Sequence, residues 1–228
     1  MKTAIVSGAS GNLGHAVITK FLAGDYKVIG TVTVNETLSF SSNKNFEAGV
    51  VDLTNEEATK TFMDSILKKY KKIDVGVLTV GGYAPGKIAE TGIIAIRQQF
   101  MLNFETAYNI AQPLFVHMLK QGSGKLFLTG ARTGIEMRYS KGMAAYGLSK
   151  SLLFRLAELM NEEAKGTDVS VTVVAPSTID TPQNRKAMPD SDPAKWVKPE
   201  DIAGMIYATA SSEFSVAKEM VIKAYNKA

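Results

Sequence analysis

The chain has 228 residues with 45% hydrophobic content, which is enough to bury a full core, and a single α/β domain spanning residues 1–228 is favoured at this length. The net charge of +4, from 26 basic and 22 acidic residues, is too mild and too dispersed to indicate a nucleic-acid partner. The absence of cysteine excludes disulfides and thiol catalysis, and no apolar run predicts a signal peptide or a membrane span, so we expect a cytoplasmic protein.

Short apolar runs alternate along the chain with longer stretches of helical periodicity. Buried strands are expected at residues 3–7, 26–33, 73–80, 125–129, 169–175 and 218–224, with a short third strand that ends at residues 50–52. Helices are expected at residues 12–23, 55–70, 91–119, 144–164 and 200–210, and loops at residues 39–45 and 181–199. This alternation predicts a parallel sheet with helices on both faces.

A glycine-rich turn, Ser7–Gly14, follows the first strand and opens the first helix. Gly8 allows a tight turn, Gly11 lets the backbone approach phosphate oxygens, and Gly14 lets the helix pack close to the sheet. An ordinary strand–helix turn is the alternative, because the glycine spacing differs from the usual dinucleotide motif. In a Rossmann-type, doubly wound fold the turn predicts a seat for a dinucleotide pyrophosphate.

Tyr146 and Lys150 form the second informative pattern. Their four-residue spacing places the phenol and the ammonium group on one face of a helix. A nearby cation favours the phenolate, so we expect Lys150 to lower the pKa of Tyr146. A tyrosine whose pKa is lowered in this way can donate or accept a proton near neutral pH.

Five further residues are candidates because of their positions after predicted strands or within a predicted helix. Asp52 closes the third strand, where it would accept from an adenine amino group, or it is a plain turn residue. Gly81 and Gly82 would border a cofactor ribose, and Tyr83 would flank the substrate unless it is only a loop aromatic. Asn103 would hold a water or a backbone carbonyl near Lys150, or it is simply exposed.

No metal site is predicted. The chain has two histidines, His15 and His117, and neither lies at metal-ligand spacing from carboxylates.

Taken in order, these motifs resemble the short-chain dehydrogenase/reductase family along essentially the whole chain. The glycine turn, Asp52, the glycine pair, Asn103, the tyrosine–lysine pair and residues 176–181 all follow the family's order. The resemblance implies catalytic roles for Tyr146, Lys150 and Asn103. It implies cofactor contacts at Gly8, Ser10, Gly11, Asn12, Leu13, Gly14, Thr33, Asp52, Leu53, Gly81, Gly82, Lys150, Pro176, Thr178 and Thr181.

Within that family, the chain looks most like the quinonoid dihydropteridine reductases. Short-chain reductases usually carry a serine after the fifth strand. Counted from the strand, its place falls on Ala131, and counted back from Tyr146 it falls on Thr133. The missing serine and above all the segment Asp180–Pro189 carry this closer resemblance.

The closer resemblance implies specific roles. Tyr146 would donate the proton, and Lys150 would lower its pKa and hold the nicotinamide ribose. Tyr83 would pack beside the pterin, Asn184 would bind the substrate from a mobile loop, and Thr181 would hold the carboxamide. Ala131 would also line the substrate site.

The cofactor is expected to be NADPH or NADH, with a slight lean to NADPH. The end of the second strand, up to Asn35, carries no acid to repel a 2′-phosphate before Glu36, and no arginine to clamp one. Thr33, Asn35 and the loop Ser41–Lys44 would accept the phosphate.

The leading hypothesis is an NAD(P)H-dependent dihydropteridine reductase. The alternatives are a short-chain reductase of another small carbonyl or quinone, with Thr133 in the serine's role, and a cofactor-binding regulator without turnover. The resemblance implies a homodimer or homotetramer, in which the helix around Asn103 and the helix that carries Tyr146 pack against a second copy. The apolar content of Leu102–Phe115 and Leu152–Met160 allows this, although packing within one chain explains the same pattern.

Overall fold

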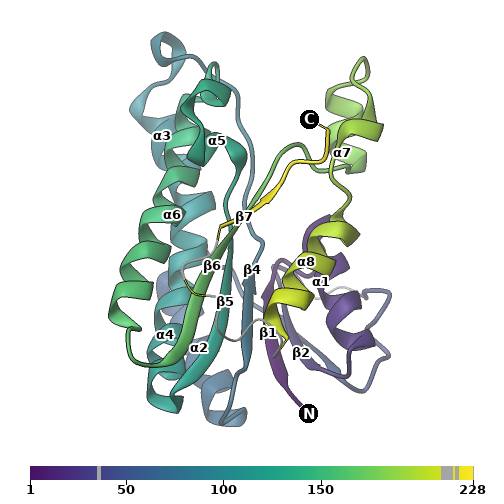
Figure 1. Ribbon diagram of the computed structural model, residues 1–228, viewed down its shortest axis with the longest axis vertical. Coiled ribbons are helices and arrows are strands. Elements are labelled where there is room, and N and C mark those ends of the chain that lie inside the picture. Colours follow the sequence, from purple (N-terminus) through teal and green to yellow (C-terminus); the bar gives the residue numbers. More distant parts are fainter. Residues whose placement is uncertain (35–36, 212–217, 219–220, 228) are drawn as a thin grey trace.

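The computed structural model describes residues 1–34, 37–211, 218 and 221–227 (Figure 1). Seven parallel strands form one sheet in the order β3-β2-β1-β4-β5-β6-β7. The strands are β1 Thr3–Ser7, β2 Lys27–Val32, β3 Phe46–Val50, β4 Val75–Leu78, β5 Ser123–Thr129, β6 Asp168–Pro176 and β7 Val221–Ala224. The predicted doubly wound parallel fold is therefore confirmed.

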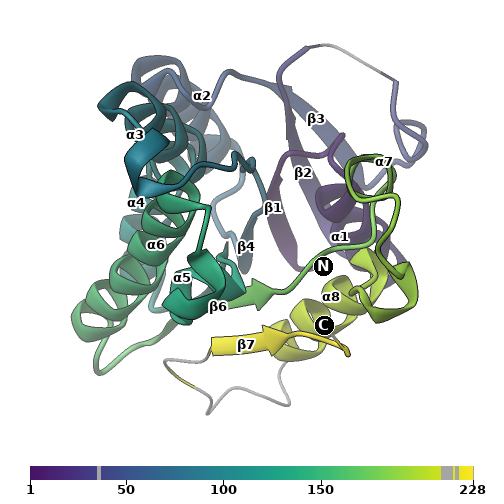
Figure 2. The same ribbon diagram turned by 90° about the horizontal axis from the view of Figure 1, so that it is seen from above.

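Helices cover both faces of this sheet. They are α1 Asn12–Ala23, α2 Glu56–Lys69, α3 Ile93–Phe100, α4 Thr106–Gln121, α5 Arg132–Ile135, α6 Ala144–Glu163, α7 Pro182–Ala187 and α8 Pro199–Ala210. Figures 1 and 2 show α1 and α8 against one face and α2, α4 and α6 against the other. No helix in the described part of the chain has the length and apolar character needed to cross a membrane.

The core consists of two layers separated by the sheet. In β1, Ala4 and Val6 pack with the residues of α1 and α8, whereas Ile5 packs with those of α2, α4 and α6. All three side chains are fully buried, which explains why the strand is a continuous apolar run instead of an alternating one.

The sequence placed β1 and α1 correctly, but three of its expectations about segments are wrong. β3 ends at Val50, so Asp52 lies in the turn beyond the strand. The expected long helix at residues 91–119 is interrupted by a π-helical turn, Met101–Glu105, between α3 and α4. The expected loop at residues 181–199 contains α7, because the Thr181 hydroxyl caps that helix and Pro182 begins it.

Two other differences concern short elements. The sequence did not predict α5 or the 3-10 turn Met137–Ser140 that follows it. The last strand begins at Val221, so Lys218 lies before it, and residues 219–220 of the expected strand fall outside the described residues.

Asn161 stabilises the junction between α6 and β6. On one side Val171 pairs with β5, and on the other side β7 pairs with β6 only from Val173 onward, so no described strand lies beside Val171 on that side. The buried side chain of Asn161 replaces that strand: its Nδ2 donates to the carbonyl of Val171, and its Oδ1 accepts from the Val171 amide, both at 2.8 Å.

We predict that Asn161→Ala lowers the free energy of unfolding by about 2–4 kcal/mol, because a buried amide and a buried carbonyl lose their partners. Urea denaturation would measure the loss. Glu162→Ala, at the exposed neighbouring position, should change stability by less than about 0.5 kcal/mol. Equal effects of the two substitutions would contradict this role of Asn161.

Candidate active site

The glycine turn is shaped to receive an anion at the start of α1. Gly8 has a φ of +72°, and its carbonyl accepts from the Gly11 amide at 3.0 Å. A Cβ on Gly14 would lie 2.1 Å from the Gly8 carbonyl oxygen, so only glycine lets α1 pack this close. Gly11 is the N-cap and has no side chain, which leaves the first amides of α1 available to a phosphate.

The turn is fixed to the sheet by a threonine. The Gly8 amide donates to Thr31 Oγ1 at 3.1 Å, and the Ala9 amide donates to the Thr31 carbonyl at 2.8 Å. Ser10, Gly11 and Asn12 are exposed beyond it. The predicted phosphate seat therefore has a rigid base and an open mouth.

Tyr146 and Lys150 lie near the start of α6, beside the end of β5. Lys150 is buried, and its Nζ donates to the carbonyl of Thr129 at 2.8 Å. Burial lowers the pKa of Lys150 to about 8. This carbonyl fixes the position of the ammonium group at the carboxyl end of the sheet, where ligands bind in doubly wound folds.

The expectation that Lys150 lowers the pKa of Tyr146 is wrong in this structure. Burial, and secondarily the neighbouring Tyr83, raise the pKa of Tyr146 to about 12. Desolvation of the phenolate therefore exceeds the influence of a lysine one helical turn away. At neutral pH the phenol keeps its proton.

Asn103 is fully buried, so the exposed alternative is wrong. The π-helical turn directs its amide to the backbone of Gly82: Oδ1 accepts from the Gly82 amide at 2.9 Å, and Nδ2 donates to the Gly82 carbonyl at 3.0 Å. Nδ2 also lies 3.1 Å from Gln99 Oε1 and from Ser149 Oγ. Single-turn π-bulges of this kind are frequent at functional sites.

Sequence reasoning missed Gln99 and Ser149, which are both buried. Ser149 Oγ donates to the carbonyl of Tyr146 at 2.8 Å, and this bond links Asn103 to the helix that carries the tyrosine. The available signal was a pair of amide side chains, Gln99 and Asn103, four residues apart in a helical pattern.

Gly81 is the point where these groups meet. A Cβ at this position would lie 2.6 Å from Asn103 Oδ1 and 3.0 Å from Lys150 Nζ. The absence of a side chain at Gly81 therefore lets Asn103 and Lys150 approach this part of the backbone closely.

Tyr83 lies on a loop whose backbone is hydrogen-bonded on both sides of it. Gly82 before it is paired with Asn103, and Gly86 after it donates to Gly142 and accepts from Ala144, at 2.8 and 2.9 Å. Its ring meets that of Tyr146 edge to face, with centroids 5.3 Å apart and planes at 78°. Because the ring remains 59% exposed, the two tyrosines form an aromatic corner that opens to solvent.

Asp52 and Leu53 do not direct their side chains to this corner. Asp52 Oδ1 accepts from the amide and the hydroxyl of Thr54, at 2.9 and 2.7 Å, and these bonds lower the pKa of its carboxyl. This is the turn role that the sequence left open. Leu53 is a core side chain, and its carbonyl accepts from Asn109 Nδ2 at 2.9 Å.

The segment after β6 crosses the carboxyl end of the sheet. Pro176 ends β6, and the carbonyl of Thr178 accepts from the Val197 amide at 2.9 Å. The hydroxyl of Thr181 accepts from the Asn184 amide, and Asn184 Nδ2 donates to the Ile179 carbonyl at 2.8 Å. Thr181 and Asn184 thus shape α7 in this structure, which is a role the sequence did not predict.

Thr33 lies just beyond β2 and is exposed, whereas Asn35 and Glu36 fall outside the described residues. Ala131 is buried as the N-cap of α5. Thr133 Oγ1 is also buried, and it has no hydrogen-bond partner among the residues that the structure describes. Ala131 and Thr133 are the two candidate positions for the serine that short-chain reductases usually carry, and neither presents a hydroxyl to solvent.

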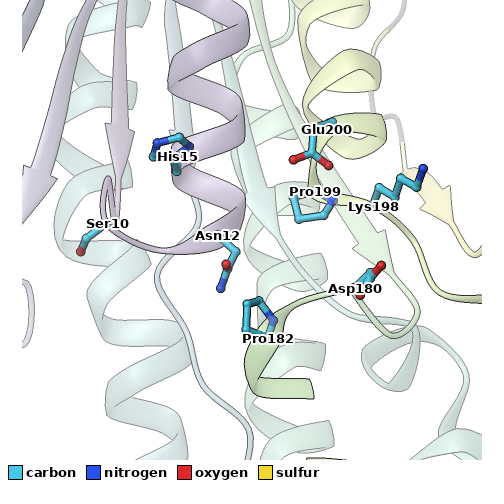
Figure 3. Close-up of a pocket in the computed structure, with 8 residues that line it drawn as sticks. All are labelled: Ser10, Asn12, His15, Asp180, Pro182, Lys198, Pro199 and Glu200. Atoms are coloured by element: carbon cyan, nitrogen blue, oxygen red, sulfur yellow. The ribbon is translucent and has the colours of Figure 1, made fainter. Parts of the chain in front are cut away.

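A polar pocket of about 400 Å³ adjoins the glycine turn (Figure 3). It lies among the N-terminus of α1, the N-terminus of α8 and the start of α7. Its lining residues are Ser10, Asn12, His15, Asp180, Pro182, Lys198, Pro199 and Glu200.

With this fold and this site, the chain belongs to the short chain dehydrogenase family, whose model matches residues 2–192. The family resemblance seen in the sequence is confirmed. Among the curated relatives, a dihydropteridine reductase of Dictyostelium discoideum is 26% identical over 218 residues, which are 94% of this chain and 90% of the relative. An acetoacetyl-CoA reductase of an Acinetobacter species is also 26% identical, over 79% of this chain and 75% of the relative.

Solved structures share the fold. The structure described as ElxO with NADP bound superposes with a TM-score of 0.89 at 22% identity, covering 97% of this chain and 96% of that one.

Burial of Lys150 makes stability depend on pH. In the unfolded chain this lysine regains its ordinary pKa of 10.5, whereas in the folded chain the pKa is about 8. Between these values the unfolded chain binds the proton that the folded chain has released, so raising the pH through this window stabilises the folded protein.

We predict that the wild type gains about 3 kcal/mol of unfolding free energy relative to Lys150→Met as the pH rises from about 8 to about 10.5, because methionine does not titrate there. Urea unfolding of both proteins across this range would measure the difference. A constant difference would contradict the lowered pKa.

Proposed function

We propose that the chain is a nicotinamide-dependent reductase of a small conjugated substrate, and specifically that it reduces quinonoid dihydropterin to tetrahydropterin. The observation that carries the proposal is the aromatic corner of Tyr83 and the protonated Tyr146, with Ala131 where a carbonyl reductase would have its serine. The dihydropteridine reductase of Dictyostelium supports the substrate assignment.

The residues present fit a nicotinamide dinucleotide. The pyrophosphate would lie on the amides at the start of α1, over the cradle that a Cβ on Gly14 would fill. The nicotinamide ribose would lie beside Gly81 and Lys150, where the backbone has no side chain to obstruct it. The cofactor, when bound, supplies the hydride. The structural neighbour described as binding NADP supports this cofactor class.

Tyr146 would supply the proton. A proton donor must hold its proton until negative charge develops on the acceptor. The pKa of about 12 keeps the phenol of Tyr146 protonated at neutral pH, which suits reduction rather than oxidation. The ammonium group of Lys150 donates to the Thr129 carbonyl and lies one helical turn from Tyr146. It would stabilise the phenolate that remains on Tyr146 after the proton is transferred.

A quinonoid ring fits the absence of a hydroxyl at Ala131. A carbonyl substrate needs its oxygen held while the hydride arrives, whereas a conjugated, electron-poor ring needs a proton donor and a flat surface. Tyr83 would supply that surface beside Tyr146. Asn184 would bind the ring from α7 after giving up its bond to Ile179.

NADPH is proposed with a slight preference over NADH. The described end of β2 carries no acid, and exposed hydroxyl groups of Thr33, Ser41 and Ser42 lie in the two segments where the 2′-phosphate would bind. These groups would accept either cofactor, since none of them repels a phosphate.

We also propose a cytoplasmic homodimer or homotetramer. Exposed apolar side chains support this proposal. Tyr108 and Leu159 lie within the two segments expected to pack against a second copy, and Met101, Val116 and Leu148 lie just outside them on the same helical elements.

Tyr146→Phe should lower the rate of reduction of freshly generated quinonoid dihydropterin by about 100-fold or more, because the proton donor is removed. The measurement is the initial rate of NADPH oxidation, and separately of NADH oxidation, with cofactor binding titrated in parallel. The ratio of the two wild-type rates gives the cofactor preference.

Tyr108→Phe, on an exposed face of α4, is the matched control and should keep the wild-type rate. Wild-type protein that binds both cofactors but does not reduce the quinonoid substrate would contradict the pterin assignment. Tight binding without turnover on any carbonyl, quinone or pterin would favour a cofactor-binding regulator.

A reductase of another small carbonyl or quinone is the second candidate, and the buried hydroxyl of Thr133, which lacks a partner among the described residues, is the observation that favours it. If a small rearrangement turned this hydroxyl to the substrate, it would take the serine's role.

Thr133→Ala separates the two candidates. We expect less than about a threefold change in the rate with quinonoid dihydropterin, because no carbonyl oxygen has to be held. Thr133→Ser serves as the control that keeps the hydroxyl. A loss of 100-fold or more in the alanine variant alone would support the carbonyl reductase instead.

A further inference from the structure

The β5–α6 connection, residues 130–143, packs against α6 at the tyrosine–lysine pair. A Cβ on Gly134 would lie 2.9 Å from the backbone carbonyl carbon of Lys150. A Cβ on Gly147, the residue after the tyrosine, would lie 2.7 Å from Ser140 Oγ. Glycine at both positions therefore lets the connection approach the helix backbone more closely than a side chain would permit.

Charged and aromatic side chains of the same connection form a cluster. The guanidinium carbon of Arg132 lies 3.5 Å from the centroid of the Tyr139 ring, and Arg132 also donates to the Tyr139 hydroxyl. Arg138 donates to the carboxylate of Glu136 at 2.7 Å, and the other oxygen of that carboxylate lies 3.9 Å from Arg132 Nε. These contacts shape the connection, but they all lie within it and do not attach it to the rest of the fold.

A tyrosine from the end of the chain extends this cluster. The guanidinium carbon of Arg132 lies 4.7 Å from the centroid of the Tyr225 ring. Figures 1 and 2 show the chain leaving β7 toward the end of the sheet at which α5 lies. The Arg132 side chain is only 17% exposed, and a cation over an aromatic ring gains more where water is largely excluded. Tyr225 therefore attaches the connection to a part of the chain that lies outside it.

The backbone holds Tyr225 on both sides. Ser177 donates from its amide to the Ala224 carbonyl and from its hydroxyl to the Tyr225 carbonyl, both at 2.9 Å. Asn226 adopts a left-handed φ of +49°, and its Nδ2 donates to the Trp196 carbonyl at 2.7 Å. The ring of Tyr225 is thus a fixed partner for the guanidinium group.

We propose that Tyr225 and Arg132 form a clamp by which the end of the chain holds the β5–α6 connection against the tyrosine–lysine pair, and that both are positioning residues for the substrate. They act through Ala131, which precedes Arg132 and would line the substrate site. The role toward the substrate rests on the proposed function, whereas the clamp itself is a property of the chain without ligand.

The first test measures hydrogen exchange in the full chain without cofactor. The amides of Gly134, Glu136 and Tyr139 donate to carbonyls within the connection, so they report on its opening. Tyr225→Ala should speed their exchange by about three- to tenfold, which is the range expected for the loss of one largely desolvated cation–π contact. Lys223→Ala, at an exposed position on β7, is the control and should leave exchange unchanged.

Two further substitutions separate the cation–π contact from plain packing. Tyr225→Phe keeps the ring and should exchange like the wild type, whereas Tyr225→Leu keeps apolar bulk without an aromatic face and should behave like Tyr225→Ala. Because Tyr225 acts through Arg132, adding Tyr225→Ala to Arg132→Met should have no further effect.

The second test measures initial rates against the concentration of quinonoid dihydropterin at saturating NADPH. Tyr225→Ala should raise KM about three- to tenfold and change kcat by less than about twofold, because the clamp positions the wall of the site and leaves the proton donor in place. Tyr225→Phe should restore KM. The Kd for NADPH should not change, since the glycine turn lies on α1.

The two tests separate failure of the clamp from failure of the proposed function. Unchanged exchange in Tyr225→Ala, or wild-type exchange in Tyr225→Leu, would overturn the clamp. Faster exchange with an unchanged KM would overturn the positioning role. Faster exchange in Tyr225→Ala, when the wild type does not reduce quinonoid dihydropterin, would support the clamp and contradict the proposed function.

Discussion

The pairing of the Asn103 amide with the backbone of Gly82 is the constraint on which the site depends. β4 ends at Leu78, and no described strand pairs with the chain at Gly82. Asn103 supplies a donor and an acceptor there instead. The π-helical turn directs this side chain inward, and Ser149 connects it to α6. The end of β4, the α3–α4 junction and α6 are therefore fixed to one another, because an unpaired buried amide would be costly.

Burial then sets the chemistry of the two groups that α6 carries. It lowers the pKa of Lys150 and raises that of Tyr146, so both neutral forms are favoured. The opposite directions have one cause, which is the cost of placing a charge in a poorly solvated layer. At neutral pH the phenol of Tyr146 therefore keeps its proton.

The sequence predicted the elements whose signals are local. β1 and α1 follow from an apolar run, a glycine turn and helical spacing, and the tyrosine–lysine pair follows from spacing alone. The direction of the Tyr146 pKa shift was wrong because burial is a property of the packed chain and cannot be inferred from a spacing of four residues. The π-helical turn was missed for the same reason: it satisfies Gly82, which lies 21 residues away.

In helix α7, local sequence signals explain why the helix forms but not where it lies in the fold. Thr181 and Pro182 are sufficient to start a helix, and a closer reading of these two residues would have predicted it. Its position depends on residues distant in the sequence: Asp180 donates to the Val197 carbonyl, and Asn12 donates to Gln183 across 171 residues. Helix α7 is not among the helices that pack extensively against another described element, so individual polar bonds contribute much of its attachment. Substitutions on α7 would therefore leave the sheet and the tyrosine–lysine pair on α6 intact.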